Sequence, residues 1–216
     1  FSLVEEVYAA IVQTERYLDI STLSAPDGRF LAAVRNAFTF LHAKNQTIDV
    51  RVILGVAAVV PKTDIGGYIQ TFLNAATRDI GSGPTQLRIA VGDYVKTGLD
   101  LLEVTWNHAK IIAVDGRLTL QGGHNLWTLD YLVSSPILDA TMAVEGEIAM
   151  HGHRFLDEAW RYICGGGRGY LQGRWTTSFP KSSDPQFCPP VPLMPLSIAA
   201  AAAATTAAFV PAQDAV

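Results

Sequence analysis

Cysteine is scarce in this sequence. Its 216 residues include two cysteines, Cys164 and Cys188, and their spacing matches no zinc-binding motif. In a secreted protein they could form a disulfide that ties the tail to the core. Two separate thiols, or bonds to cysteines outside this chain, are the alternatives that the sequence leaves open.

Positive charge is also in short supply. The chain has 16 Lys and Arg residues against 20 Asp and Glu residues, which gives a net charge of −4. Proteins that bind nucleic acid broadly usually present a basic face. The charge balance therefore argues against that class, although a local basic patch remains compatible with it.

Long apolar runs are missing as well. No stretch of about 18 residues is apolar enough to span a bilayer, and the nearest candidate, residues 198–210, is short and mostly Ala and Thr. The sequence begins at Phe1 without a charged-then-apolar leader, which suggests a processed protein or a fragment. Hydrophobic residues nevertheless make up 49% of the chain and charged residues 17%, so we expect a substantial core.

Hydrophobic periodicity predicts an α/β fold. Apolar residues at helical spacing predict helices over residues 3–16, 30–43, 66–79 and 147–163, and buried or alternating runs predict strands over 16–23, 48–55 and 86–92. This alternation predicts parallel neighbouring strands with helices on the faces of the sheet. His151 and His153 lie at the start of the last helix, where we assign them to a polar helix face rather than to a metal site.

The pattern of predicted elements changes after residue 100. Short strands are predicted within residues 101–106, 110–115 and 117–123, with Asp115-Gly116 as a hairpin turn, and another strand over 139–146. The fold class is therefore a mixed β-sheet flanked by helices on both faces. We place one lobe at residues 1–179 and a Pro/Ala-rich linker or terminal extension at residues 180–216.

The stretch "WNHAKIIAVDGRLTLQGGHN" carries the candidate chemistry. His108 and Lys110 project from the same face if this segment is a strand. The ammonium favours a neutral, nucleophilic imidazole, and the pair can hold an anion between them. Attack on a phosphoryl group needs this combination of a nucleophile and fixed positive charge.

Three more residues of the stretch complete the pattern. Asn125 follows the glycine pair that includes Gly123, where the backbone can approach a ligand closely, and the Asn125 amide can donate to a phosphate oxygen. Asp115 belongs to the same motif and is counted among the candidate catalytic residues. Strand alternation places it on the face opposite Lys110, however, which favours a role in bracing the hairpin.

These residues resemble the HKD signature of the phospholipase D superfamily. The segments "TWNHAKIIAVDG", "GGHNLWTLDYL", "SPILD" and "RFLDEAWRYIC", with "DISTLSAPDGRF" and "VRVILG" upstream, are similar to the amino-terminal half of secreted bacterial-type phospholipase D. The likeness covers roughly residues 3–179. It implies a phospholipase D-type α-β-α lobe and a secreted, extracellular protein.

The resemblance also implies a role for each matching residue. His108 corresponds to the histidine that attacks phosphorus and becomes phosphohistidine, while Lys110 and Asn125, with Gly123 beside them, correspond to phosphate-binding positions. Asp139 lies where the family places a carboxylate that orients the other ring nitrogen, which would fix the tautomer for attack through Nε2. Trp127, Asp130 and Tyr131 match the same region without an assigned role. No metal and no cofactor are implied.

The pattern is half of what the family uses, because a second His-x-Lys motif is missing. His42-Ala43-Lys44 repeats the tripeptide, but it falls in a predicted helix without the downstream Asp or Gly-Gly-x-Asn. We therefore expect a second HKD-bearing half from a cleaved partner chain or from a second subunit. Without it, a large apolar face would be exposed.

The favoured interpretation is a phospholipase D that acts on phospholipid at a membrane or micelle surface. It would release phosphatidic acid and a head-group alcohol, and it could also transfer the phosphatidyl group to other alcohols. A homodimeric HKD nuclease is the alternative, although the acidic charge balance makes nucleic acid a poor partner. A non-catalytic binding domain that kept the fold is the third possibility.

Overall fold

The computed structural model describes residues 2–55, 65–81, 86–97, 104–133, 137–164 and 175–177. Its centre is a seven-stranded sheet in the order β8-β7-β6-β1-β2-β3-β9. The strands are β1 Tyr17–Thr22, β2 Ile48–Leu54, β3 Leu87–Asp93, β6 Ile111–Val114, β7 Leu118–Gly122, β8 Thr141–Glu145 and β9 Trp175–Thr177. β1, β2 and β3 are parallel, whereas β6, β7, β8 and β9 pair antiparallel with their neighbours, so the sheet is mixed as predicted.

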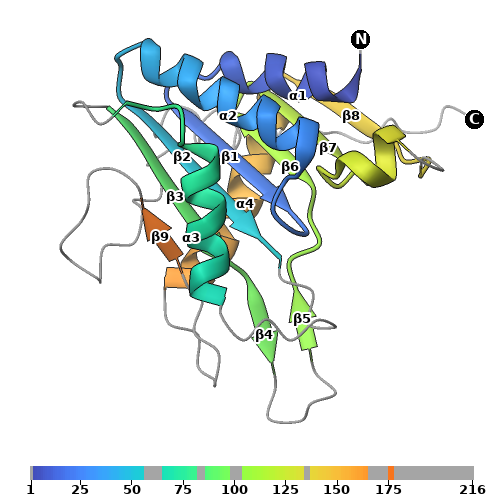
Figure 1. Ribbon diagram of the computed structural model, residues 1–216. Helices are drawn as coiled ribbons and strands as arrows, with labels where there is room; N and C mark the ends of the chain where they lie inside the picture. Colours follow the sequence, from blue (N-terminus) through green and yellow to red (C-terminus); the bar gives the residue numbers. More distant parts are fainter. Residues whose placement is uncertain are drawn as a thin grey trace, which may run out of the picture.

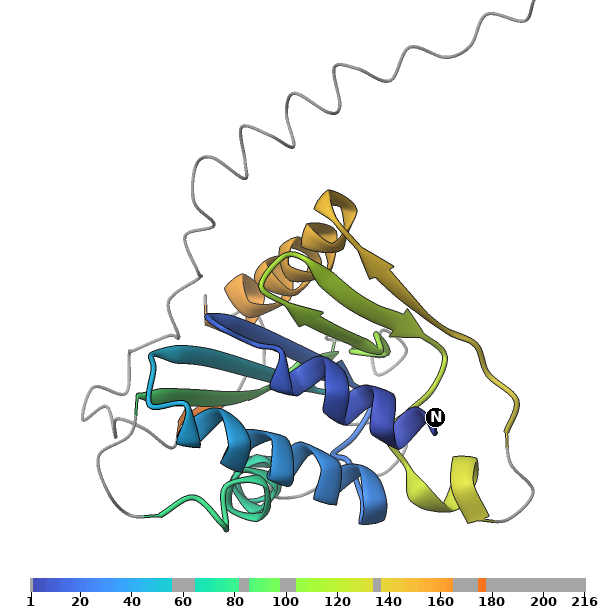
Figure 2. The same ribbon diagram turned by 90° about the horizontal axis from the view of Figure 1, so that it is seen from above.

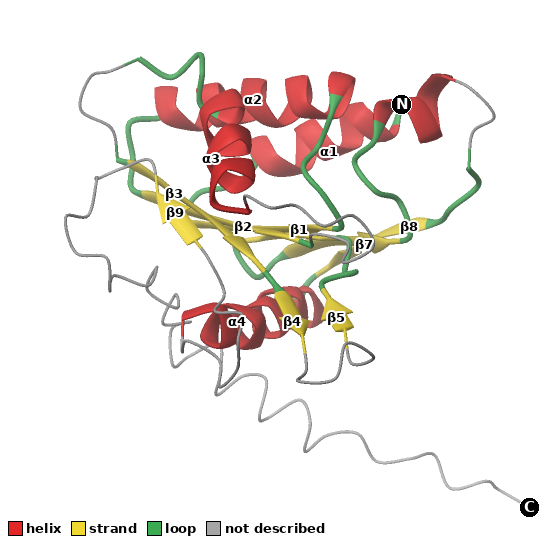
Figure 3. Ribbon diagram, turned by 60° about the horizontal axis from the view of Figure 1, so that its bottom comes forward, coloured by secondary structure: helices red, strands yellow, loops and turns green. Residues whose placement is uncertain are grey.

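Helices cover both faces of this sheet (Figure 3). One face carries α1 (Leu3–Val12), α2 (Gly28–Ala43) and α3 (Ile65–Ala76), while α4 (Met150–Cys164) lies on the other. A separate hairpin of β4 (Val95–Thr97) and β5 (Val104–Trp106) projects beyond the end of the sheet in Figure 1. Seen from above in Figure 2, α1 and α2 run side by side across the sheet. A mixed sheet with helices on both faces confirms the predicted α/β class.

Alternation along the strands divides the core in two. Leu18 and Ile20 of β1 join the larger cluster under α1, α2 and α3. Ile53 of β2 and Ala113 of β6 face the other way and pack with Trp160 of α4. β1, β2 and β3 are therefore buried on both faces, as expected for parallel strands covered by helices, although the face toward α4 also includes polar side chains.

The structure confirms each predicted helix and the strands β1, β2, β3, β6, β7 and β8 to within a few residues, and β5 falls within the predicted strand 101–106, of which residues 104–106 are described. It adds features that the sequence pattern did not indicate, namely β4, β9, a π-helical turn over Leu129–Val133 (η1) and a 3₁₀ turn over Glu147–Ala149 (η2). Cys188 and the predicted extension, residues 180–216, lie outside the described residues, so the disulfide and the domain boundary stay predictions. Within the part of the chain described here, no helix has the length and apolar character to cross a membrane.

A buried polar cluster lies between the sheet and α4. Arg51 of β2 donates two hydrogen bonds to Asp19 of β1, both 2.7 Å, and a third of 2.6 Å to Asp157 of α4. His153, only 1% exposed, places Nδ1 2.5 Å from the Asp19 carboxylate. The prediction that His153 lies on a polar surface face of the helix is therefore wrong, because the helix turns this ring inward toward Asp19, whereas His151 is exposed as predicted.

Candidate active site around His108 and Lys110

His108 and Lys110 lie together near the carboxyl ends of the parallel strands β1 and β2. They lie in a non-regular segment, residues 107–110, that leads into β6. Lys110 Nζ is 3.0 Å from His108 Nδ1 and 3.1 Å from Nε2, and it donates to the His108 carbonyl oxygen at 2.9 Å. The side chains are together as predicted, but the predicted reason, alternation within a strand, is wrong because β6 begins only at Ile111.

The charge state of the pair suits nucleophilic attack. Burial lowers the pKa of His108 below its ordinary value, and the positive charge of Lys110 lowers it further. Burial likewise lowers the pKa of Lys110, although the nearby carboxylate of Asp139 opposes this. At neutral pH the lowered pKa favours the neutral imidazole, which lies beside the Lys110 ammonium.

Replacing Lys110 by Met is expected to raise the pKa of His108 toward its ordinary value. The charge contribution disappears while the contribution of burial stays, so the shift is partial. In the wild type the ring stays neutral to a lower pH, whereas in the variant protonation begins at a higher pH. An NMR titration of the ring measures the difference, and Lys44→Met in the look-alike His42-Ala43-Lys44 serves as control. An unchanged His108 titration would refute this electrostatic coupling.

Asp139 lies close to this pair without bonding to the ring. Its carboxylate accepts a 2.9 Å hydrogen bond from the Tyr131 hydroxyl, and its charge acts on Lys110. The hydrogen bond predicted between Asp139 and His108 is not formed among the described residues, because Lys110 Nζ lies against both ring nitrogens. The structure therefore places Asp139 at the site but leaves its orienting role a prediction.

The glycine pair makes room for Asp139. A Cβ atom on Gly123 would collide with the Asp139 carboxylate, and one on Gly122 would collide with the carbonyl of Ala140. The Gly123 amide donates to the Ala140 carbonyl at 2.9 Å. Because that N–H is already used, the predicted phosphate-binding role of Gly123 does not fit this geometry, and its function is to permit the close approach of Asp139.

Asn125 is buried and in contact with Tyr131. The Tyr131 hydroxyl interacts with Asn125 as well as with Asp139, so one phenol links the two candidate residues. The Oδ1 atom of Asn125 has no hydrogen-bond partner within the described part of the chain. The predicted contact between its amide and phosphate stays a prediction. Near it, His124 Nδ1 is 2.7 Å from the Thr141 hydroxyl, and its ring lies 5.0 Å from that of Tyr131.

Asp115 braces the hairpin, at the opposite end of β6 from His108. Its carboxylate accepts hydrogen bonds from the backbone N–H groups of Glu15, Arg16 and Tyr17, at 2.7, 2.8 and 2.8 Å. The residue has a positive φ of 51°, which the turn requires. This geometry agrees with the bracing role, and it excludes direct contact with a substrate at His108, so Asp115 does not fit the catalytic set.

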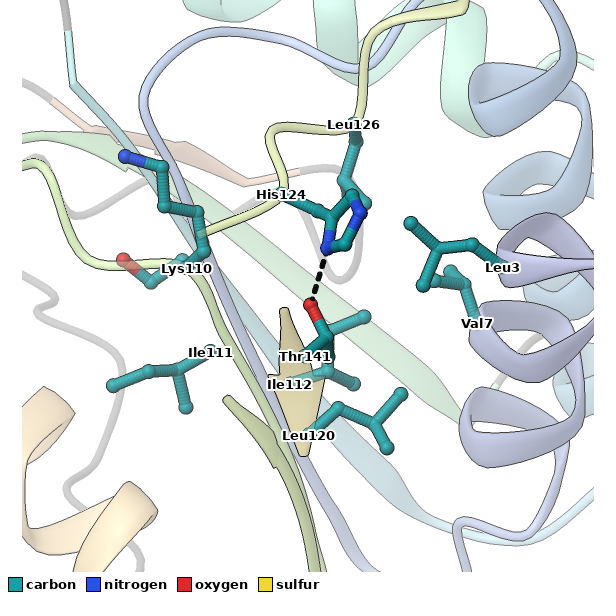
Figure 4. A pocket seen from close by; sticks show the side chains of 10 residues that line it. Leu3, Val7, Lys110, Ile111, Ile112, Leu120, His124, Leu126 and Thr141 are labelled. Atoms are coloured by element: carbon teal, nitrogen blue, oxygen red, sulfur yellow. Dashed lines mark hydrogen bonds between the residues drawn. The ribbon is translucent and has the colours of Figure 1, made fainter. Parts of the chain in front are cut away.

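Two cavities flank the Lys110 stem. On the α1 side, a small one of about 20 Å³ lies between Leu3 and Val7 and the sheet, large enough for roughly one water molecule. Figure 4 shows the Lys110 ammonium pointing away from this cavity. His124 and Thr141, which also line it, are joined by a hydrogen bond. This cavity is too small for a substrate.

A wider cleft of about 380 Å³ opens on the α4 side. His108 and Lys110 line it together with Ile148, Phe155 and His151. Ile148 is 64% exposed and Phe155 is 55% exposed, so the wall beside the nucleophile is apolar and open. No group of three or more metal-ligating side chains is found in the ranges that the structure describes.

Sequence reasoning gave no role at the site to several residues that surround it. Tyr131, His124 and His151 are brought there by the turn η1, by the β7–β8 pairing and by the placement of α4. Tyr131 reaches the site through its contacts with Asn125 and Asp139, whereas His124 and His151 are placed by the packing of separate strands and helices. No spacing rule in a single sequence signals them.

The fold and the site together define an α/β lobe with one HKD motif at the carboxyl edge of its parallel strands. No family model matches the chain. Over 164 residues the chain is 29% identical to a phospholipase D of Streptomyces antibioticus. The matched region makes up 75% of this chain and 28% of that relative. The resemblance predicted from the motif is confirmed by this similarity to a phospholipase D. It spans less than a third of the length of this relative.

Three solved structures are also similar to the chain. Nuc of Salmonella typhimurium, described as a phospholipase D family member, is 14% identical with a TM-score of 0.49 and covers 81% of this chain and 91% of its own. NucT from Helicobacter pylori is 11% identical with a TM-score of 0.49, covering 72% and 86%. Phosphatidylserine synthase of Haemophilus influenzae is 16% identical with a TM-score of 0.45, covering 93% and 43%.

Proposed function

We propose that this chain is the nucleophile-bearing part of a secreted phosphodiesterase that hydrolyses glycerophospholipids. The observation that carries the proposal is the contact of His108 with Lys110, 3.0 Å from Nδ1 to Nζ, in a cleft with an apolar wall, and the lowered pKa of His108 agrees with it. The similarity to a phospholipase D supports the same assignment.

The proposed chemistry has two steps. Nε2 of His108 attacks phosphorus, the bond to the head-group oxygen breaks, and a phosphatidyl–His108 intermediate forms while Lys110 neutralises charge on the phosphoryl oxygens. Water then attacks phosphorus from the opposite side and the bond to Nε2 breaks, which gives phosphatidic acid and free histidine. An alcohol in place of water gives a transphosphatidylation product.

The proton steps need a second group. The leaving head-group oxygen must gain a proton, and the attacking water must lose one. We infer that a second histidine, from an HKD-bearing half outside these 216 residues, supplies both steps. That this chain spans only 28% of the length of its phospholipase D relative is consistent with such a half in the same protein.

The substrate class is tested with the full-length protein in parallel assays. Phosphatidylcholine vesicles and plasmid DNA are incubated with equal amounts of enzyme, and phosphatidic acid and nicked DNA are measured. Release of phosphatidic acid with intact DNA is expected. Cleavage of DNA alone would favour a nuclease, and the absence of both products would favour a binding domain.

The apolar cleft wall gives a more specific prediction. Phe155→Ser is expected to lower kcat/KM on phosphatidylcholine vesicles roughly tenfold, because one partly buried aromatic contact is worth about 1–2 kcal/mol. Turnover of the small soluble diester bis(4-nitrophenyl) phosphate, which has no acyl chains, should be unchanged. Phe40→Ser is the matched control, since Phe40 is 47% exposed on α2, away from the cleft. Equal losses on both substrates would contradict an acyl-chain contact.

A further inference from the structure

The loop that carries His108 is fixed by its preceding residue. The side chain of Asn107 reaches over His108, and its Oδ1 accepts the backbone N–H of Ala109 at 3.2 Å. This is an Asx-turn, in which a side chain replaces a backbone carbonyl, and His108 is the residue at its centre. Asn107 is buried although it belongs to a loop.

The other end of the Asn107 amide is attached to the sheet. Nδ2 donates to the Ser21 hydroxyl at 2.8 Å and to the Thr22 carbonyl at 3.3 Å, both at the end of β1. The Ser21 hydroxyl in turn donates to the Ala109 carbonyl at 3.1 Å. Both polar groups of the Ala109 backbone are therefore held by Asn107 and by the Ser21 that Asn107 contacts.

The backbone of Asn107 is held as firmly as its side chain. Its N–H donates to the carbonyl of Tyr94 at 3.0 Å. Its carbonyl lies so close to Gly55, the residue after β2, that a Cβ atom there would collide with it. Asn107 and Ala109, the residues on either side of His108, are thus in contact with the ends of three parallel strands, while His108 lines the cleft.

We propose that Asn107 is a positioning residue, whose Asx-turn anchored to Ser21 and Thr22 fixes the His108 imidazole beside Lys110 in the orientation for attack on phosphorus. This proposal rests on the proposed phosphodiesterase function. A fixed nucleophile raises the rate of the chemical step, and a displacement of about 1 Å can cost about 10²-fold. Asn107 would therefore act on kcat and leave substrate binding nearly unchanged.

The test compares three variants of the full-length protein. Asn107→Ala removes the turn, and Asn107→Ser restores only an acceptor for the Ala109 N–H. Thr14→Val is the control, because Thr14 is buried and loses one hydrogen bond of 2.7 Å to Ile11, far from the site. We expect kcat on phosphatidylcholine to fall roughly 30–100-fold in Asn107→Ala with KM within about threefold. Asn107→Ser should recover about tenfold of this loss, and Thr14→Val should behave as wild type.

A second measurement needs no substrate. The NMR titration of the His108 ring, assigned with His108→Gln, should move toward an ordinary histidine in Asn107→Ala and stay unchanged in Thr14→Val. A wild-type titration in Asn107→Ala, or a kcat loss no larger than that of the control, would overturn the proposal. If Asn107→Ala does not fold, Asn107→Ser is compared with the control by the same criteria. An inactive wild type would refute the proposed function, whereas the ring titration would still decide the role of Asn107.

Discussion

His108→Ala in the full-length protein is expected to lower kcat/KM for phosphatidylcholine by at least about 10⁴-fold, because it removes the atom that forms the covalent bond to phosphorus. Lys110 remains, so a phosphodiester can still bind. The second histidine has no covalent intermediate to resolve, and only slow direct attack by water is left. The variant should therefore lose hydrolysis and alcohol transfer together.

The covalent intermediate is measured by trapping. Substrate labelled with ³²P is mixed with excess enzyme and quenched in alkali, where phosphohistidine survives, and the label on the protein is counted. Wild type should carry label and His108→Ala should carry none. His42→Ala is the matched control, because it changes the other His-Ala-Lys tripeptide, which lies at the end of α2. Labelling of His108→Ala equal to that of wild type would show that the nucleophile lies elsewhere.

Most of the fold was readable from the sequence because burial decides it. The runs that became β1, β2 and β3 are rich in apolar residues and bounded by turn signals, and the helices between them have one apolar side, so period and composition agree. The three-residue strands β4 and β9 carry no such signal. Strands this short are defined by their pairing partners, and pairing across the chain cannot be read from local periodicity.

The candidate site also has a part that the sequence predicted and a part that it did not. His108 and Lys110 are two residues apart, so local geometry was enough to bring them together. The relation of Asp139 to the ring depends on how far β8 approaches β7 across the glycine pair, and on where the Lys110 ammonium lies. Likewise, nothing near Asn107 in the sequence shows that Ser21, 86 residues away, bonds to it.

His153 shows why buried charge is hard to predict. Its position near the start of α4 favoured a solvated face, but the helix faces a sheet that presents Asp19 and Arg51 on adjacent strands. Burial raises the pKa of Asp19, yet the charge of Arg51 and hydrogen bonds from His153 and Arg51 outweigh it and hold this pKa below its ordinary value. Burial raises the pKa of Asp157, and Arg51 opposes this in part. Arg51 is therefore the cation that makes two buried carboxylates tolerable.

Arg51→Met is accordingly expected to lower the free energy of unfolding by about 3–5 kcal/mol at pH 7, the usual result of leaving a buried charge without its partner. Urea denaturation measures the loss. Arg88→Met is the matched control, because Arg88 also donates two hydrogen bonds to a carboxylate on the adjacent strand, that of Asp49, but is 42% exposed in its side chain. Its loss should stay below about 1 kcal/mol, as for surface ion pairs.

The pH dependence separates lost charge pairing from lost packing. In the wild type the folded pKa of Asp19 is lowered, so its contribution to stability is present above the ordinary carboxylate pKa and is lost as pH falls through the folded value. In Arg51→Met burial acts on Asp19 unopposed by Arg51, which raises its folded pKa, so the variant is penalised most at neutral pH and the penalty fades on acidification. Both effects reduce the advantage of the wild type on acidification. The difference in stability between wild type and variant should therefore shrink from pH 7 toward pH 4. A difference that stays constant over this range would mean that Arg51 stabilises the sheet through its packing volume and not through its charge.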